Sequence, residues 1–216
     1  MKEKIISIIN QKGGVGKTTT VINLAAGLSI NNKKILVIDL DPQGNATTGL
    51  GLSNVDPTSN SIYQILSGTK KIDDAISKTK FSNLDIITSN VDLSGLEVET
   101  ANDAQRAYIL KEKLTAYLNT SSRSYDYVLI DCPPSLSLLT VMALVASHSL
   151  LVPLQTEFFA LEGITQLIKT IERIKIGLNP DLLIRGILLT MYDKRNKLSG
   201  DVEVEARNYF KEKVYK

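Results

Sequence analysis

The sequence predicts an α/β protein with a mainly parallel, twisted sheet that carries helices on both faces. Short β-branched apolar runs alternate along the chain with longer segments whose apolar residues have helical spacing. Strands that are separated by helices are joined by right-handed crossovers, which favours parallel pairing. The chain has 216 residues, of which 43% are hydrophobic and 22% charged, so it can bury one sizeable core.

The first half of the chain opens with a strand, a glycine-rich loop and a helix. The patterns predict strands at residues 4–9 (KIISII), 34–39 (KILVID) and 84–88 (LDIIT), and helices at 17–30, 60–67 and 72–78. Residues 45–61 are rich in Gly, Asn, Ser and Thr and form the longest stretch without a repeating pattern. We expect a mobile loop there.

The second half continues the same alternation. Ala107, Leu110 and Leu114 have helical spacing. The patterns predict helices at residues 103–118, 136–146, 161–176 and 202–213, and strands at 125–131 (YDYVLID), 148–154 and 183–191.

Composition excludes several classes of protein. The formal net charge is only +2, so composition alone does not indicate a nucleic-acid binder, although a local basic patch is compatible with it. The single cysteine, Cys132, excludes an internal disulfide and a multi-cysteine metal cluster within one chain. The first apolar run breaks into a polar loop, unlike a signal peptide, and no apolar stretch approaches the roughly 18 residues of a membrane helix. A soluble, cytoplasmic protein is expected.

Residues 9–20 (INQKGGVGKTTT) end like a phosphate-binding loop, at Gly16, Lys17 and Thr18. The usual glycine five positions before Gly16 is replaced by Gln11, and Lys12 adds a second lysine near the start of the loop. The pattern therefore raises the question whether the site is damaged or uses the extra lysine.

Strand, glycine loop and helix form the context in which such a loop binds phosphate. Gly13 and Gly14, together with Gly16, let successive backbone N–H groups point at one anion, and the helix that begins near Lys17 adds its positive dipole end. Lys17 would reach the terminal phosphates, and the Thr18 hydroxyl would bind Mg²⁺. A glycine-rich turn without function would not require Lys17 and Thr18 at these places.

Three aspartates follow predicted strands. Asp131 ends the strand YDYVLID, while Asp39 and Asp41 stand at the end of KILVID. Ligands of open parallel sheets bind at the carboxyl ends of the strands, so these carboxylates should gather beside the glycine loop. Each aspartate by itself could instead cap a helix or begin a turn.

With these motifs in view, the chain resembles the ParA/Soj partition ATPases, a branch of the MinD-like P-loop proteins with a deviant Walker A motif. The resemblance runs from residue 4 to the end of the chain. It rests on KGGVGKTT at residues 12–19, DLDPQGN at 39–45, DCPP at 131–134, PLQ at 153–155 and FALEG at 159–163.

The resemblance implies a role for each residue of the motifs. Lys12 would cross a nucleotide sandwich dimer to touch the partner's ATP, so that Gln11 is a family feature and the site is not damaged. Asp41 would position the attacking water, Asp131 would hold Mg²⁺ through water, and Asp39 would be secondary to the metal. The residues implied to bind ATP are Gly13, Gly14, Val15, Gly16, Lys17, Thr18 and Thr19.

The resemblance also implies a molecular switch. ATP and Mg²⁺ would be the cofactors, and ATP would form a homodimer that binds DNA nonspecifically. A centromere-binding partner of the ParB type would stimulate slow hydrolysis, placing the protein in the cytoplasm at the nucleoid and not at a membrane. Lys194 and Arg195 are the candidate DNA contacts, or they are solvated loop charges.

Several alternatives stay open at this stage. Residues 1–216 are expected to be a single P-loop ATPase domain that lacks the family's usual C-terminal strand and helix, so the adenine contacts would lie beyond residue 216. A MinD-like positioning ATPase at the membrane is one alternative function. An inactive fragment or interaction module is another, although Lys12, Lys17, Asp41 and Asp131 are intact.

Overall fold

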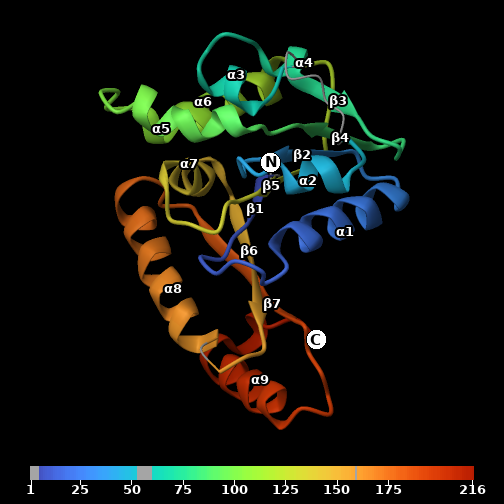
Figure 1. Ribbon diagram of the computed structural model, residues 1–216, viewed down its shortest axis with the longest axis vertical. Helices are drawn as coiled ribbons and strands as arrows, with labels where there is room; N and C mark the ends of the chain where they lie inside the picture. Colours follow the sequence, from blue (N-terminus) through green and yellow to red (C-terminus); the bar gives the residue numbers. More distant parts are fainter. Residues whose placement is uncertain (1–4, 53–59, 159) are drawn as a thin grey trace.

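The computed structural model describes residues 5–52, 60–158 and 160–216. Among these residues, a seven-stranded sheet has the order β3-β4-β2-β5-β1-β6-β7 (Figure 1). Neighbouring strands are parallel, except that β3 is antiparallel to β4. The predicted mainly parallel α/β fold is thus confirmed. The strands are β1 (Ile5–Ile8), β2 (Ile35–Asp39), β3 (Ile76–Lys78), β4 (Leu84–Ile87), β5 (Tyr127–Asp131), β6 (Ser149–Gln155) and β7 (Leu183–Thr190).

The helices that connect these strands follow most of the predicted segments, and α1 has the predicted bounds. The α-helices are α1 (Lys17–Ile30), α2 (Asn45–Gly49), α3 (Ile62–Leu66), α4 (Ile72–Ala75), α5 (Leu96–Glu99), α6 (Ile109–Thr120), α7 (Leu138–Ala146), α8 (Ala160–Gly177) and α9 (Lys197–Phe210). Short 3₁₀ turns lie at Val91–Gly95, Arg106–Tyr108 and Lys211–Lys213.

The inner strands β1, β2, β4, β5 and β6 are buried on both faces because their side chains alternate between two layers of helices. In β2, Ile35 and Val37 pack in the cluster that contains α1, while Leu36 and Ile38 pack in the cluster that contains α6 and α7. Figure 1 shows α7 and α8 on one side of β1 and β6, with α1 on the other. This sandwich fixes the carboxyl ends of the central strands at one edge.

The expected loop at residues 45–61 is wrong in its first part. Asn45–Gly49 form α2, and Gly44, which immediately precedes the helix as its N-cap, has a left-handed conformation (φ 63°). The backbone N–H of Thr47 donates to Asp39 (2.8 Å). This capping contact comes from a residue outside the segment, so composition could not reveal it. Residues 53–59 lie outside the described part of the chain, as do Lys4 and Phe159.

The helix predicted at residues 72–78 is also wrong at its end. The α-helix stops at Ala75, and Ile76–Lys78 form β3, whose Ile76 pairs with Ile87 of β4. The segment is too short for its periodicity to separate a helix from a strand. Tertiary contacts decide its conformation.

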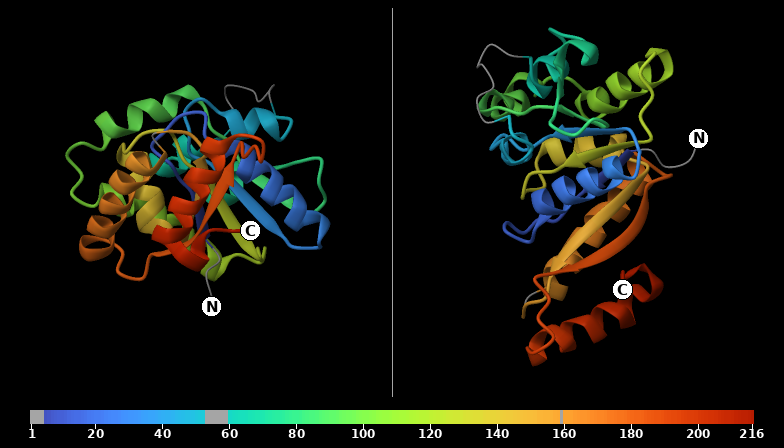
Figure 2. Two further views of the ribbon diagram at one scale, coloured as in Figure 1. Left: turned by 90° about the horizontal axis from the view of Figure 1, so that it is seen from below. Right: turned by 90° about the vertical axis from the view of Figure 1, so that its right-hand side faces the viewer.

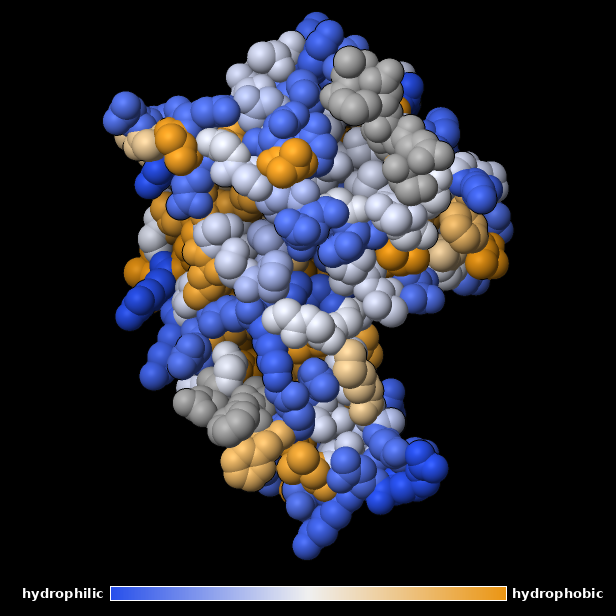
Figure 3. All heavy atoms as spheres, viewed as in Figure 1, coloured by the Kyte–Doolittle hydropathy of each residue, from blue (hydrophilic) through white to orange (hydrophobic). Residues whose placement is uncertain are grey.

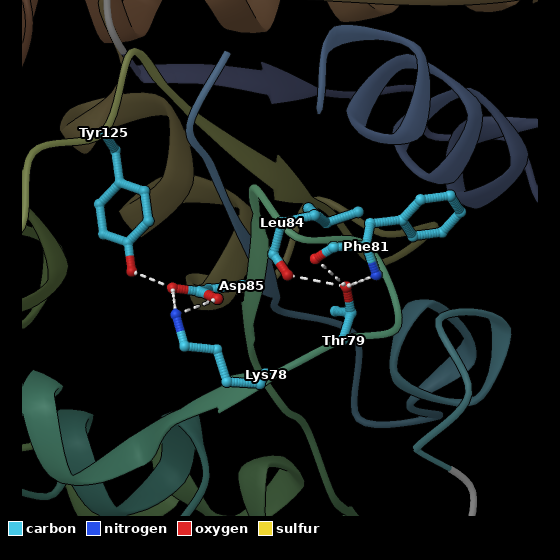
Figure 4. Close-up of polar contacts among 6 residues, drawn as sticks. All are labelled: Lys78, Thr79, Phe81, Leu84, Asp85 and Tyr125. Carbon is cyan, nitrogen blue, oxygen red and sulfur yellow. Dashed lines mark hydrogen bonds and ion pairs between the residues drawn. The ribbon is translucent and has the colours of Figure 1, made fainter. Parts of the chain in front are cut away.

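Polar contacts around a buried carboxylate hold β3 against β4 (Figure 4). Asp85 of β4 accepts a hydrogen bond from the Tyr125 hydroxyl (2.7 Å) and one from Lys78 Nζ (2.9 Å). At the turn between the strands, the Thr79 hydroxyl donates to the Leu84 carbonyl (2.7 Å). The Asp85 contacts join an edge strand to the strand beside it and to the residues that lead into β5.

Two further differences lie outside the sheet. The helix predicted at 202–213 begins at Lys197, because Asn196 caps it by accepting from Leu198 N–H (3.0 Å). The short helix α5 was not predicted, since four residues carry no readable period.

Near the end of the chain, Val214 forms an isolated parallel bridge with Ile187 of β7. The described residues thus begin a further pairing on the outer edge of β7.

The helix α1 covers only part of its face of the sheet. Beside β6 and β7 lies a hollow of about 670 Å³ with mainly apolar walls that include Leu24, Leu28, Leu151, Leu188 and Tyr215. Figure 3 shows the outline of the molecule stepping inward below α1, on a face that is otherwise largely hydrophilic. The right-hand view of Figure 2 shows α9 at the opposite end of the molecule from α3 and α6. No helix in the described residues has the length and apolar character of a membrane span.

Candidate functional site

The loop between β1 and α1 has the backbone of an anion-binding turn. Gly14 (φ 75°) and Gly16 (φ 88°) are both left-handed, a conformation that other residues rarely adopt. Gly16 has no side chain to cap α1, which begins at Lys17. The first N–H groups of the helix are therefore directed to the space that the loop encloses.

Side chains from distant strands fix this loop in place. Asn10 donates from Nδ2 to the Pro153 carbonyl (2.7 Å), and its Oδ1 accepts from Lys12 N–H (3.0 Å). The Thr190 hydroxyl, at the end of β7, donates to the Val15 carbonyl (2.8 Å). Sequence reasoning missed Asn10 and Thr190, since the contacts of Asn10 with Pro153 and of Thr190 with Val15 join residues that are remote in sequence.

Lys17 is buried in the loop that it follows. Lys17 as a whole is only 7% exposed, and its Nζ donates to the Lys12 carbonyl (2.9 Å). Burial lowers the pKa of Lys17, while the carboxylates of Asp131 and Asp41 favour its charged form. The structure therefore brings the loop lysine together with two of the three predicted aspartates.

Asp131 is a buried carboxylate at the centre of the site. Neither of its oxygens has a hydrogen-bond partner of ordinary geometry among the described residues. Burial raises the pKa of Asp131 to about 7, with a further increase from Asp39 and Asp41 and an opposing effect of the Thr18 hydroxyl. Such an uncompensated carboxylate beside a hydroxyl fits a cation that binds hard oxygen ligands.

The hydroxyl of Thr18 and the carboxylate of Asp131 suit Mg²⁺ better than they suit a metal ion whose ligands all come from the protein. Within the described residues, no group of three or more His, Cys, Asp or Glu side chains is placed to hold a metal ion. Mg²⁺ usually keeps several waters and binds one or two protein groups together with substrate phosphates. Thr18 and Asp131 beside a phosphate loop match that arrangement.

Asp39 is turned toward α2. It is fully buried and accepts from Thr47 N–H (2.8 Å), the Thr47 hydroxyl (2.7 Å) and Asp41 N–H (3.2 Å). Burial raises its pKa to about 6, and these hydrogen bonds oppose the shift. Asp39 pairs in register with Asp131 across β2 and β5. Its secondary role toward the metal stays a prediction. Its visible role is to hold α2 on β2.

Asp41 lies just beyond β2, at the edge where the loop stands. It is 7% exposed, and its Oδ1 accepts from Gln43 N–H (3.0 Å). Its charge acts on both Lys17 and Asp131. The residue is thus placed near the phosphate loop, as the strand-end argument predicted.

Lys12 has a partner that the sequence did not indicate. Its ammonium forms an ion pair with Glu157, in the segment between β6 and α8. The side chains are 51% exposed for Lys12 and 28% exposed for Glu157. No motif reasoning had singled out Glu157.

The two candidate DNA-contacting residues lie between β7 and α9. The Arg195 side chain is 89% exposed and forms a two-pronged contact with Asp193, from Nε (3.0 Å) and Nη2 (2.8 Å). That contact raises the pKa of Arg195 and lowers the pKa of Asp193. Arg195 therefore carries a local counter-charge, and Lys194 stands beside it exposed to solvent.

Comparison with known proteins places this site in a wider context. A family model described as an AAA domain matches residues 3–184. The chromosome partitioning protein ParA of Caulobacter vibrioides (strain NA1000 / CB15N) is 50% identical over 212 residues, which cover 98% of this chain and 78% of that protein. The sporulation initiation inhibitor protein Soj of Bacillus subtilis (strain 168) is 47% identical over 213 residues, covering 99% of this chain and 82% of that protein.

Solved structures share the fold. A cobyrinic acid a,c-diamide synthase from Mycobacterium smegmatis, solved with a bound ATP analog and magnesium, has a TM-score of 0.87 and 37% identity, and the match covers 96% of this chain and 83% of that chain. A plasmid partition protein from Borrelia burgdorferi has a TM-score of 0.83 and 30% identity, covering 99% of this chain and 88% of that chain.

Proposed function

The chain belongs to the ParA/Soj family of partition ATPases, and we propose that it works as an ATP-driven switch in DNA segregation. ATP joins two copies into a dimer, the dimer binds DNA without sequence preference, and slow hydrolysis separates the copies again. A ParB-type partner stimulates the hydrolysis, and the protein acts at the nucleoid. The phosphate loop, with Lys12 beside Lys17 and facing the unpaired carboxylate of Asp131, is the observation that carries this proposal.

ATP and Mg²⁺ are the cofactors of this family fold, in line with the nucleotide and magnesium of the solved relative. The backbone N–H groups of residues 13–19 bind the phosphates, and Lys17 exchanges the Lys12 carbonyl for a phosphate oxygen. Thr18 and Asp131 would hold Mg²⁺. Bound Mg²⁺ supplies neutralisation of charge on the phosphate oxygens.

Two residues carry the hydrolytic step in this proposal. Asp41, which is fixed beyond β2 by its contact with Gln43 N–H, orients the attacking water. Lys12 extends into the partner copy and neutralises the charge that develops on the transferred phosphoryl group, as a cation supplied in trans does in other phosphoryl-transfer sites. Intrinsic turnover is slow because these groups align only in the dimer.

Partition is favoured over the amidation chemistry that the name of one structural neighbour suggests. Two relatives with partition or sporulation names are 50% and 47% identical to this chain, whereas that neighbour is 37% identical. The sequence offers no residues that mark a pocket for a small second substrate. We therefore assign the nucleotide site to a switch and not to a synthetase.

DNA binding gives the test of this function. We expect the chain to bind duplexes of unrelated sequence with ATP but not with ADP, and to lose affinity steeply as salt rises. Lys194→Ala and Arg195→Ala should each weaken binding equally on all sequences and lower the salt slope by about one. Fluorescence anisotropy at several salt concentrations measures both quantities, with Lys169→Ala on α8 as the control. Equal DNA affinity with ATP and ADP would contradict the proposal.

A further inference from the structure

The ion pair between Lys12 and Glu157 raises a question about the switch. In this structure the Lys12 side chain turns onto its own subunit and contacts Glu157. The proposed function, on which this inference rests, requires the same ammonium to reach ATP in the partner. The Glu157 carboxylate and the phosphates of the partner's ATP would therefore compete for the same ammonium.

Glu157 is presented by a fixed segment of the fold. Its N–H donates to the Gln155 carbonyl at the end of β6 (2.9 Å). The adjoining residue, Thr156, is buried, and its hydroxyl lies within hydrogen-bond distance of Ser199 Oγ (3.1 Å) and of the Met191 carbonyl (3.4 Å). These contacts tie the Glu157 backbone to β7 and α9, so the carboxylate meets Lys12 at a defined place.

The backbone of Lys12 is also fixed, by hydrogen bonds to Asn10 and Lys17. Its N–H donates to Asn10, and its carbonyl accepts from Lys17. Asn10 in turn is bonded to the Pro153 carbonyl of β6, the strand that leads to Glu157. Because both backbones are held, forming the ion pair does not require either backbone segment to become ordered.

We propose that Glu157 is a cis counter-ion that holds Lys12 on its own subunit and opposes dimerisation. Formation of the dimer must break this pair in both copies, since a symmetric interface uses the same contacts twice. Phosphate charge in the partner has to outcompete the Glu157 carboxylate for the ammonium. The pair thereby sets the threshold at which the nucleotide brings two copies together.

Glu157→Gln tests this role because it removes the charge and keeps the shape. Exposed ion pairs stabilise a structure modestly, so the loss of two pairs should tighten the dimer on the order of tenfold. Sedimentation velocity with Mg²⁺ and a non-hydrolysable ATP analogue measures the dimer dissociation constant. An unchanged or weaker dimer would overturn the inference.

Three controls separate the ion pair from other effects. Glu157→Asp keeps the charge and should retain most of the opposition to dimerisation. Glu172→Gln removes an exposed carboxylate of α8 and should leave the dimer constant unchanged. In a Lys12→Ala background, which is expected to form no dimer, Glu157→Gln should change the free energy of unfolding no more than Glu172→Gln does, and an equal effect of Glu157→Gln with and without Lys12 would contradict a role through that lysine.

The outcomes for the inference and for the function differ. If the unsubstituted chain dimerises with the analogue and Glu157→Gln dimerises equally, the inference falls and the proposed function stands. If neither protein dimerises at any concentration, both fall. A double-mutant cycle on the free energy of unfolding of the single copy tests the pair independently, and a coupling of zero between Lys12 and Glu157 would also overturn the inference.

Discussion

At the scale of single residues, the site contains ionisable side chains whose burial disfavours their charged forms. Lys17 and Asp131 are both buried, which lowers the pKa of the lysine and raises the pKa of the aspartate. Each shift disfavours the charged form that phosphate and Mg²⁺ would need. Burial of these charged groups therefore destabilises the empty site, and the binding of Mg²⁺ and ATP would offset that unfavourable free energy.

The raised pKa of Asp131 gives a prediction about stability and pH. The folded chain binds this proton more tightly than the unfolded chain, so the free energy of unfolding falls as pH rises from about 4 to about 7. We expect Asp131→Asn to gain stability relative to the unsubstituted chain across that window, by a few kcal/mol at about 1.4 kcal/mol per pKa unit. Urea unfolding at pH 5 and pH 8, without nucleotide or Mg²⁺, measures the difference.

A second aspartate serves as the control for this experiment. Asp201, on α9, is exposed, so Asp201→Asn should change stability by the same small amount at both pH values. If the difference between Asp131→Asn and the unsubstituted chain were also the same at pH 5 and pH 8, the carboxylate would not be buried and unpaired as described.

The sequence predicted most of these residues, because a phosphate loop is contiguous and strand-end aspartates meet at one edge. Lys17, Asp41 and Asp131 lie near one another as that reasoning expected, and their roles toward ATP and Mg²⁺ stay predictions. Glu157 could not be found, since its partner Lys12 is remote in sequence and its loop matches no spacing rule. The secondary role of Asp39 toward the metal stays a prediction, and sequence reasoning did not indicate the hydrogen bonds that it accepts from Thr47 of α2 and from Asp41 N–H.

At the scale of elements, those with a clear local sequence pattern were predicted, and those that depend on tertiary contacts were not. The central strands were predicted because they are continuous apolar runs bounded by polar or glycine-rich segments, and α1 because it directly follows the glycine loop. The pieces Ile76–Lys78 and Asn45–Gly49 were not, since each depends on side chains from another part of the chain. Short elements at the edge of this sheet are set by their neighbours.

The contact that holds β3 gives a prediction at this scale. Tyr125→Phe removes a hydrogen bond to the buried carboxylate of Asp85, and we expect a loss of about 1–2 kcal/mol in the free energy of unfolding. Tyr117 is the matched control, because its buried hydroxyl has no hydrogen-bond partner among the described residues. Tyr117→Phe should therefore be neutral or slightly stabilising. Equal losses in the two variants, by urea unfolding, would refute the role given to Tyr125.

At the scale of the whole molecule, the strand order explains why one edge of the sheet carries the chemistry. The neighbours β2, β5 and β1 end side by side, so the register brings Asp39 and Ile8 opposite Asp131. β6 and β7 extend the same edge and supply the contacts from Pro153 and Thr190 to the loop. The nucleotide site is thus coupled to the end of the molecule that carries α8, α9 and the candidate DNA loop.

The central claim is that this loop makes ATP the signal for dimerisation, with Lys12 acting across the interface. The most direct measurement is sedimentation velocity of the unsubstituted chain, Lys12→Ala and Lys17→Ala, each with Mg²⁺ and ATP or ADP, beside an ATP-binding titration. We expect a dimer only for the unsubstituted chain with ATP, retained ATP binding without dimer for Lys12→Ala, and no ATP binding for Lys17→Ala. Equal amounts of ATP-dependent dimer in the unsubstituted chain and in Lys12→Ala would contradict the account.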